Sequence, residues 1–510
     1  MSGIDVRAAV GLTGRVTLLL IVPLLLPMAA ALYYGEPVLP FLTAIAVAVA
    51  IGGGLLAVGR DRDIGTREGL FMVTVTWLVV AAIGAVPYLI AAHGVPGVVA
   101  PQTPTSTLGS PVNALFESMS GFTTTGATVL GVIDPAVHGR AMLLWRQLTQ
   151  WLGGMGIVVL AVAILPRLSV GGAQLMETEA PGPGIEKLKP HIAATARTLW
   201  TIYIALTALE VALLVLVGQL GLDPAMTPYN ALAHGLTTMP TGGFSPAARS
   251  IEAFAMVTQL VIIPFMFIAG TNFALLWHLL QRDGTAVLAD GEFRGYVTAV
   301  VGVAGVLTVI LALGSAPGAV GAAVVEATFQ AVAIVTTTGY ASVDYTAWPM
   351  AGQLLLLVAM FIGGSTGSTG GGIKLLRWVL IIKAIRRDLF AVVHPRAVRP
   401  VRLNGRAVDE DALQSVQMLT LVYLLVLTSG AVLIALDTAA AGITTTGLEL
   451  IGIAATAIGN VGPAFGQFGP MGSFLELPTV SKLVMIALMW IGRLEVIPVL
   501  VLLTRAFWRG

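Results

Sequence analysis

The sequence predicts an all-α integral membrane protein. We expect four repeats of helix, re-entrant half-helix and helix around a central pore, preceded by a two-helix hairpin, with about ten spanning helices in all. Of the 510 residues, 56% are hydrophobic and only 10% are charged, and the mean hydropathy is +0.91. A soluble domain carries about 25% charged residues. This composition is the first reason for the prediction. The second is an alternation of basic and glycine-rich connections, and the third is a set of four short apolar stretches that are each followed by a glycine.

The spans are predicted from apolar stretches of about 20 residues, the length of a helix that crosses a bilayer. The first two, 16–32 and 38–58, form the hairpin. Arg7 and Arg15 precede the first, so a cleaved signal peptide is an alternative, but the second stretch follows almost at once and favours an uncleaved hairpin. The other stretches lie at 70–92, 142–165, 197–220, 254–280, 296–314, 351–383, 413–436 and 480–504.

The connections alternate in charge, which predicts the orientation. Lys and Arg gather in 59–68, 166–197, 281–295 and 374–406 and at the C-terminus, and are scarce in the other set. Because basic loops stay on the cytoplasmic side, we expect these segments and both termini to be cytoplasmic. The absence of cysteine excludes disulfides and thiolate metal sites.

The outward connections are long and apolar, and each contains a half-length helical stretch that suits a re-entrant helix. These stretches are Val112–Phe122 before Gly126, Pro228–Thr238 before Gly242, Ala323–Val335 before Gly339, and Leu448–Ile458 before Gly462. The repeated pattern predicts an N-terminal hairpin at 1–68 and four repeats at 69–180, 181–290, 291–400 and 401–510.

Four glycine-rich loops at membrane depth predict a shared pore, because lipid cannot satisfy free backbone N–H and C=O groups. The C-terminal end of each half-helix would bring partial negative charge to the centre, and backbone carbonyls would replace the water around an ion. Glycine permits the backbone conformations that aim carbonyls inward. Because no acidic ring lies at the loop tips, we expect a monovalent cation rather than calcium. A single Thr-Gly pair would be an ordinary turn; four in register are not.

Over essentially the whole chain, the sequence resembles the Trk/Ktr/HKT potassium-transporter superfamily. The segments S-G-F-T-T-T-G-A-T (120–128), T-M-P-T-G-G-F-S (238–245), I-V-T-T-T-G-Y-A-S-V-D-Y (334–345) and G-N-V-G-P-A-F-G (459–466) are similar to its four selectivity-filter loops. The leading hairpin resembles that of the TrkH-type membrane subunit. The resemblance implies potassium uptake across a bacterial inner membrane, with K+ as the transported ion and no organic cofactor.

The resemblance also implies the residues that hold the ion. They are Thr124, Thr125, Gly126, Pro240, Thr241, Gly242, Thr337, Thr338, Gly339, Asn460, Val461 and Gly462. In plant members, serine at the first filter glycine goes with sodium permeation, so Gly126 implies a preference for potassium. Glu117, Glu326 and Glu449 lie on the half-helices, where we expect them to support the scaffold.

A second glycine-rich segment, Gly363–Gly372, interrupts the stretch 351–383. A phosphate-binding loop is the alternative, but the pattern does not fit it, because Ile373 separates the glycines from Lys374 and no Ser or Thr follows. The resemblance implies an intramembrane gate loop at 363–373, with Arg493 beside it. The implied gate residues are Gly364, Gly367, Gly370, Gly371, Gly372, Lys374 and Arg493. The alternative for Arg493 is a structural role, paired with Glu495 or with carbonyls.

The resemblance implies a homodimer in the lipid bilayer and a separate cytosolic nucleotide-binding ring of the TrkA type, which would dock on 166–197 and 374–406. No feature predicts nucleic-acid binding. The sequence offers no nucleophile with a base and no carboxylate pair at membrane depth, so we do not expect an enzyme, although a polytopic membrane enzyme is the alternative of a different class. Conduction of sodium or another monovalent cation on the same scaffold stays open, as does coupling of transport to H+ or Na+.

Overall fold

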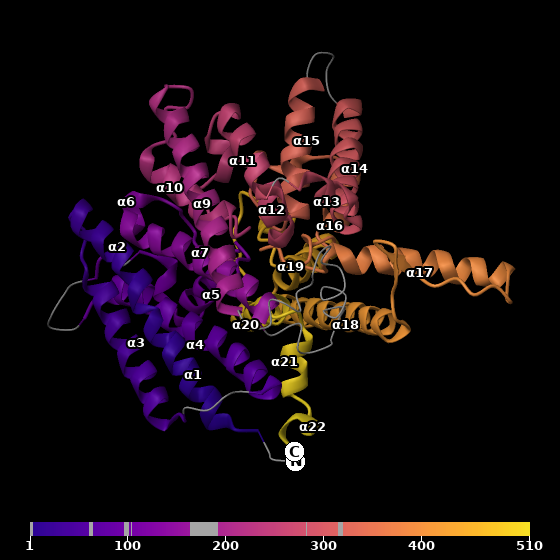
Figure 1. Ribbon diagram of the computed structural model, residues 1–510. Coiled ribbons are helices and arrows are strands. Elements are labelled where there is room, and N and C mark those ends of the chain that lie inside the picture. Colours follow the sequence, from indigo (N-terminus) through magenta and orange to yellow (C-terminus); the bar gives the residue numbers. More distant parts are fainter. Residues whose placement is uncertain are drawn as a thin grey trace.

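The computed structural model describes residues 4–60, 65–95, 101–103, 105–163, 192–281, 283–314 and 320–509. These residues form a bundle of long helices, with one small antiparallel ribbon in which β1 (Arg402–Leu403) pairs with β2 (Arg406–Ala407) (Figure 1). The predicted all-α membrane fold is therefore confirmed.

Several helices are long and apolar enough to cross a membrane. In the described residues, six helices have the length and apolar composition of a membrane span, and a bent pair of helices would make a seventh if it counts as one span. The six are Val6–Tyr34, Leu39–Val58, Arg67–His93, Ala196–Gln219, Gly291–Leu313 and Glu410–Ala440. Each covers a stretch that the sequence predicted to span.

In the N-terminal hairpin, α1 (Val6–Leu19) and α2 (Ile21–Tyr34) together form the first span, and α3 (Leu39–Val58) forms the second. Glycines let α1 and α3 approach closely: a Cβ atom on Gly14 would lie 2.8 Å from the carbonyl oxygen of Gly52. Small residues are the usual contact between helices in a bilayer, where there is no hydrophobic force between them. The hairpin then packs against the first helix of the next unit.

Four units follow, each with a long helix, a short helix and a third helix. Their helices are α4 (Thr66–His93), α5 (Pro111–Phe122) and α7 (Arg140–Ala163); α9 (Ile192–Gln219), α10 (Pro228–Thr238) and α11 (Met256–Ala269); α14 (Gly291–Gly314), α15 (Val320–Val335) and α16 (Met350–Ala359); and α18 (Glu410–Ala440), α19 (Gly447–Gly459) and α20 (Thr479–Arg493). The four short helices coincide with the predicted half-helices. The predicted boundary at 180 and 181 lies outside the described residues.

Further elements, most of them short, connect these helices. They are η1 (Thr107–Gly109), α6 (Pro135–His138), η4 (Ser250–Ala253), α12 (Phe273–Leu280), α13 (Gly284–Ala289), η5 (Tyr345–Ala347), α17 (Leu375–Val393), η6 (Gly466–Phe468), α21 (Ile497–Leu502) and α22 (Arg505–Trp508). Local signals start the short helices: α5 and α10 have Pro in the first turn, and Thr446 and Glu449 form a capping box on α19.

The short helices are buried toward their C-terminal ends. The last seven residues of α5, from Phe116 to Phe122, are all buried, and so are the last seven of α15, from Phe329 to Val335. The C-terminal halves of α10 and α19 are buried in the same way. Each helix therefore enters the bundle and ends inside it, so the loop that follows lies in the interior.

Two stretches that the sequence predicted as continuous spans are broken. Residues 254–280 divide into α11 and α12, which meet at an angle of 104° after Gly270. Residues 480–504 divide after Arg493, where Glu495 and Val496 have φ of 59° and 64°. Hydropathy did not reveal either break, because both sides are apolar.

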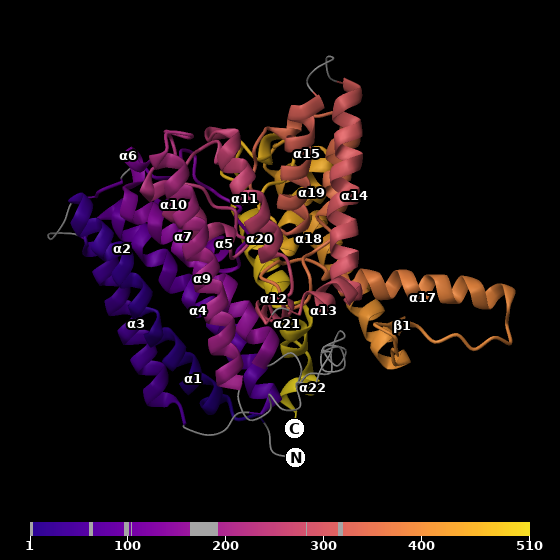
Figure 2. The ribbon, with the colours of Figure 1, turned by 45° about the horizontal axis from the view of Figure 1, so that its top comes forward.

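The predicted interruption in 351–383 is confirmed, but the stretch after it does not continue as a span. Helix α17 leaves the bundle sideways and projects beyond it, as both views show (Figures 1 and 2). Lys383 and Arg387 lie on this projecting helix, which accounts for its basic sequence. Most of the basic segment 166–197 lies outside the described residues.

Candidate functional site: four loops around a common axis

The loops that follow the four short helices share one backbone pattern. Each has a non-glycine residue in the left-handed region, at Thr124 (φ 51°), Thr241 (φ 55°), Thr337 (φ 60°) and Asn460 (φ 53°). Two residues later each has a glycine in the same region, at Gly126 (φ 83°), Gly243 (φ 78°), Gly339 (φ 71°) and Gly462 (φ 115°). A non-glycine residue in this region costs about 1–3 kcal/mol, so the surrounding structure must hold these loops in place.

This pattern corrects the alignment of the second loop. The sequence analysis matched Gly242 with the other three glycines, but the residue with the matching backbone is Gly243. Gly242 instead corresponds to Thr125, because the N–H groups of both donate to a carbonyl five residues earlier, in Thr237 and Ser120. The sequence T-G-G offered two glycines, and only the backbone geometry distinguishes them.

The four glycines and their neighbours form a closed ring. A Cβ atom on Gly126 would lie 2.2 Å from the carbonyl oxygen of Gly242, and a Cβ atom on Gly243 would lie 2.0 Å from the carbonyl oxygen of Thr338. A Cβ atom on Gly339 would lie 1.8 Å from the carbonyl oxygen of Val461, and a Cβ atom on Gly462 would lie 2.9 Å from the carbonyl oxygen of Thr125. Each contact leads to the next loop and the fourth returns to the first. The loops therefore surround a common axis, and at each glycine a side chain would collide with the next loop.

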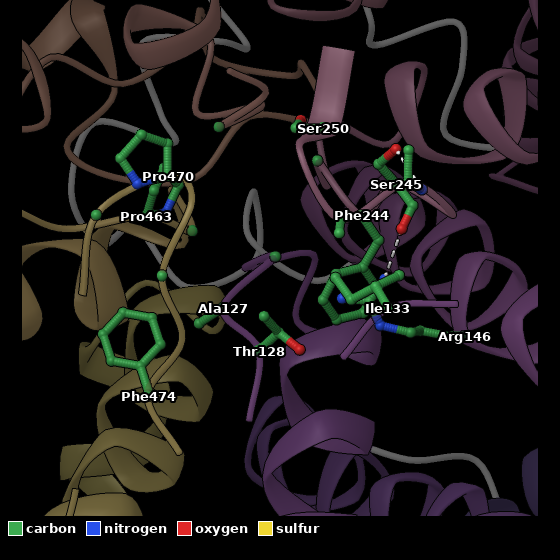
Figure 3. Close-up of a pocket in the computed structure, with 18 residues that line it drawn as sticks. Ala127, Thr128, Ile133, Arg146, Phe244, Ser245, Ser250, Pro463, Pro470 and Phe474 are labelled. Atoms are coloured by element: carbon green, nitrogen blue, oxygen red, sulfur yellow. Dashed lines mark hydrogen bonds between the residues drawn. The ribbon is translucent and has the colours of Figure 1, made fainter. Parts of the chain in front are cut away.

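A hollow opens on one side of the ring, and all four glycines line it. Figure 3 shows Pro463 and Phe474 on one wall and Phe244, Ser245 and Arg146 on the opposite wall. Apart from Arg146, the labelled residues follow the loop glycines in sequence. The hollow is therefore the mouth of the ring on the side where the chain leaves the loops.

Hydrogen bonds of side-chain hydroxyl groups stabilise the loops. The hydroxyls of Thr123 and Thr125 lie 2.7 Å apart, and those of Thr336 and Thr338 make the same contact at 2.7 Å. Loops are also joined to one another, since Asn460 Nδ2 donates to Thr125 Oγ1 over 2.9 Å. Thr241 Oγ1 donates to the carbonyl of Pro240 over 2.6 Å.

The structure brings together all twelve residues that the sequence predicted for this site, within the four loops. None of them carries an ionisable side chain. The ring can therefore offer an ion only backbone carbonyls, hydroxyls and the partial negative charge at the ends of four short helices. Groups of this kind suit a cation without providing the fixed charges that a divalent ion would favour.

The glycine-rich segment between α16 and α17 contacts the other side of the ring. Gly371 N donates to Thr337 Oγ1 over 2.7 Å, and Thr369 Oγ1 donates to the carbonyl of Met239 over 2.9 Å. Both partners precede their loop glycine, whereas the hollow is lined by residues that follow. The segment and the hollow therefore lie on opposite sides of the ring.

The same segment fits into the bend between α11 and α12. Ser365 N donates to the carbonyl of Gly270 over 2.9 Å, and Phe273 N donates to that of Gly367 over 3.2 Å. At its base, Gly363 N donates to the carbonyl of Ile373, and Leu375 N donates to that of Gly364. The break in α11–α12 thus supplies backbone groups that hold this segment.

Two buried cations bind carbonyls of the segment. Arg493 is 2% exposed; its Nη1 donates to the carbonyl of Thr369 over 2.9 Å and its Nη2 to that of Gly153 over 3.1 Å. Lys374 Nζ donates to the carbonyl of Gly370. The sequence analysis named Glu495 or backbone carbonyls as partners of Arg493 in a structural role. The structure shows the carbonyls, whereas Glu495 forms an ion pair with Arg377.

Sequence reasoning missed three buried polar side chains that hold these loops. Glu292 on α14 accepts the N–H of Thr366 over 2.6 Å and that of Leu376 over 3.2 Å. Arg146 and Gln150 on α7 bind the second loop. For Arg146 and Gln150 the available signal was a polar residue inside an apolar span, which by default marks a functional position. Glu292 lies before the predicted span 296–314 and gave no such signal.

Comparisons with known proteins identify the family of the chain. The family model of TrkH, a cation transport protein, matches residues 39–508. The chain belongs to the TrkH family. The Trk system potassium uptake protein TrkH of Escherichia coli K12 is 36% identical over 512 residues, 99% of each chain. TrkG of the same strain, also a Trk system potassium uptake protein, is 32% identical over 524 residues, 100% of each.

A solved structure is similar over nearly the same range. The crystal structure of the potassium transporter TrkH from Vibrio parahaemolyticus matches with a TM-score of 0.85 and 32% sequence identity, covering 99% of this chain and 100% of that one. Membership of the TrkH family makes this chain a multi-pass membrane protein of cation transport and not an enzyme.

Proposed function

We propose that this TrkH-family chain takes up potassium ions through the ring of four loops, which serves as its selectivity filter. The observation that carries the proposal is the closed cycle from Gly126 to Gly462, in which each loop glycine lies against a carbonyl of the next loop. Backbone carbonyls around one axis can replace the hydration shell of a potassium ion. The names of the similar proteins support the same ion.

The driving force for uptake is the membrane potential, worth about 2.3 kcal/mol per charge for each 100 mV. An ion enters from the hollow, loses water in the ring and leaves past the glycine-rich segment. Glycine at 126 leaves room for the carbonyl of Gly242. The family resemblance links serine at this position to sodium permeation, which supports potassium as the ion here.

In this proposal, the segment 363–373 is the gate. It is hydrogen-bonded to Thr337 and to the carbonyl of Met239 at the inner side of the ring. Arg493 adds a positive charge at the same place, which raises the energy of a cation there. Opening requires that these bonds break and that the charge moves or is neutralised.

The orientation that we propose has the hollow outside and both termini in the cytoplasm. Arg60 N donates to the carbonyl of Arg7, and the rings of Phe71 and Trp508 lie 5.8 Å apart, so both ends of the chain contact described residues that flank the basic connection between α3 and α4 (Figure 2). Basic loops favour the cytoplasm.

Family resemblance leads us to propose also the hairpin at 1–68, four repeats at 69–180, 181–290, 291–400 and 401–510, a second copy of the chain, and a separate nucleotide-binding ring. The exposed basic residues Arg386 on α17 and Arg396 just after it offer that ring a docking surface.

The test is potassium uptake. Cells that lack their own uptake systems are starved of potassium, with and without this gene, and the purified chain is reconstituted in proteoliposomes with a potassium gradient. We expect rescue of growth and a flux that exceeds the sodium flux. No rescue together with no flux would overturn the proposal, and equal fluxes would favour a nonselective conductor.

A further inference from the structure

The second loop is held by a side chain that belongs to the first unit. Gln150 on α7 is fully buried, its Nε2 donates to the carbonyl of Gly242 over 2.6 Å, and its Oε1 accepts the N–H of Phe244 over 3.1 Å. The two bonds span Gly243, the ring glycine of this loop. A glutamine amide suits this place because it offers one donor and one acceptor, which the two backbone groups require.

Gln150 occupies the place of a side chain that the second loop lacks. Loops one and three have Thr125 and Thr338 at the position before the ring glycine, and each threonine has a hydroxyl brace behind it. The second loop has Gly242 there, and a Cβ atom on it would lie 2.4 Å from Gln150 Cδ. The amide therefore takes the place of the missing threonine brace, and a side chain at position 242 would displace it.

A second side chain on the same face of α7 strengthens the contact. Arg146 lies one helical turn before Gln150; its Nη1 donates to the carbonyl of Ser245 over 3.1 Å, and its guanidinium lies 3.4 Å from the ring centre of Phe244. Arg146 is itself held by Glu117, with 2.6 Å between Nε and Oε1. Helix α7 thus binds the second loop both at and beyond its ring glycine.

We propose that Gln150 is a specificity-determining residue of the pore, because it fixes the direction and spacing of the Gly242 carbonyl. The inference rests on the proposed function of the ring as a potassium filter. Discrimination between potassium and the smaller sodium ion depends on the number and the field of the carbonyls around the ion and on how far they can move. In the first and third loops hydroxyl pairs of the loop itself hold that position, and in the fourth loop, which has Val461 there, the neighbouring Asn460 is bound to Thr125 Oγ1 of the first loop. In the second loop Gln150 sets it, and its amide donor also withdraws negative charge from one of four carbonyls.

The experiment compares three variants of the full-length chain in proteoliposomes, with potassium and sodium fluxes measured separately. Gln150→Met keeps the length and burial of the side chain but makes neither bond. Gln150→Glu keeps the shape and an acceptor for Phe244 N but places an oxygen opposite the Gly242 carbonyl. The control is Gln147→Met: Gln147 lies on the same helix and is equally buried, and its amide atoms have no hydrogen-bond partner in the described structure.

We expect the potassium-to-sodium flux ratio to fall about twofold to tenfold in both Gln150 variants, the size of effect that one buried hydrogen bond confers. The Gln147 variant should keep the wild-type ratio. Size-exclusion profiles in detergent identify variants that do not fold; the isosteric Gln150→Glu serves if Gln150→Met does not. A wild-type ratio in a folded Gln150 variant would overturn the inference while the potassium flux of the wild type upholds the proposed function. A wild type without flux would overturn the proposed function itself.

Discussion

Gly371 donates its backbone N–H to the hydroxyl of Thr337 over 2.7 Å, which joins the glycine-rich segment directly to the third loop of the ring. The segment that blocks the pathway in our proposal is thus bound to the element that selects the ion. A change in either one must change the environment of the other, because the same hydroxyl serves both.

The first prediction concerns this hydroxyl. Thr337→Val removes the acceptor for Gly371 N but keeps the shape of the side chain, so the closed segment loses one hydrogen bond. Since such a bond contributes about 0.5–1.5 kcal/mol, we expect basal potassium flux to rise about twofold to tenfold in proteoliposomes. Thr337→Ser keeps the hydroxyl and should behave as the wild type. Equal flux in the valine and serine variants would show that the bond does not hold the segment closed.

The second prediction concerns Arg493. Arg493→Ala removes a buried positive charge beneath the ring and the bond to the carbonyl of Thr369. We expect basal potassium flux to increase, whereas Arg493→Lys should retain most of the barrier because it retains the charge. Fluxes are measured per folded protein after size exclusion. A simple loss of folded protein in the alanine variant, with no gain in flux, would support a structural role instead.

The third prediction concerns the size of the ring at Gly126. Gly126→Ser places a side chain where a Cβ atom would lie 2.2 Å from the Gly242 carbonyl, so the loops must shift and a hydroxyl enters the pathway. We expect sodium flux to rise relative to potassium flux. Gly302→Ser is the control, because no atom lies within 4 Å of a Cβ at that helix position. Unchanged selectivity in Gly126→Ser would mean that the first loop is not the filter.

The fourth prediction tests the corrected alignment of the second loop. At Gly243 the φ of 78° and a backbone carbonyl 2.0 Å from a Cβ both oppose a side chain, so Gly243→Ala should reduce potassium flux to below about a tenth of that of the wild type. At Gly242 a Cβ atom meets only the end of the Gln150 side chain, which can move, so Gly242→Ala should retain more flux. The reverse order of the two variants would restore Gly242 as the ring glycine.

The fifth prediction concerns the ion pair of Glu117 and Arg146, whose side chains are 0% and 2% exposed. Arg146→Met leaves the Glu117 carboxylate buried without its partner and should destabilise the protein by about 3–5 kcal/mol. The double variant Glu117→Gln with Arg146→Met should recover much of that loss, because no unpaired charge remains. Thermal unfolding in detergent measures both. A double variant no more stable than the single one would show that the pair acts through its other hydrogen bonds.

Much of the fold followed from the sequence, because lipid imposes a simple rule on it. Spanning helices must be apolar for about 20 residues, and non-helical backbone at membrane depth must be buried in protein. These constraints predicted the four short helices to within three residues at their first position, including Pro228–Thr238 without error. The glycines of Gly363–Gly372 also predicted that the apolar stretch 351–383 would be broken.

Other features were beyond the reach of hydropathy. The bend after Gly270 joins two helices that are equally apolar, and it is stabilised by Ser365 and Gly367 from about a hundred residues away. Likewise the composition of α17 does not predict its sideways course, since a basic amphipathic helix can lie along many surfaces. Such choices depend on partners that are distant in the chain.

The sequence by itself determined that this chain is a membrane protein with four glycine-centred loops, because apolar length and the steric demands of glycine are local properties. Only the tertiary structure decided that Gly243 rather than Gly242 completes the ring, and that Gln150 braces it. The physical reason is that a carbonyl direction, a left-handed φ and a hydrogen bond between units depend on atoms brought together by folding. Two adjacent glycines are identical as letters and differ only in what lies beside them.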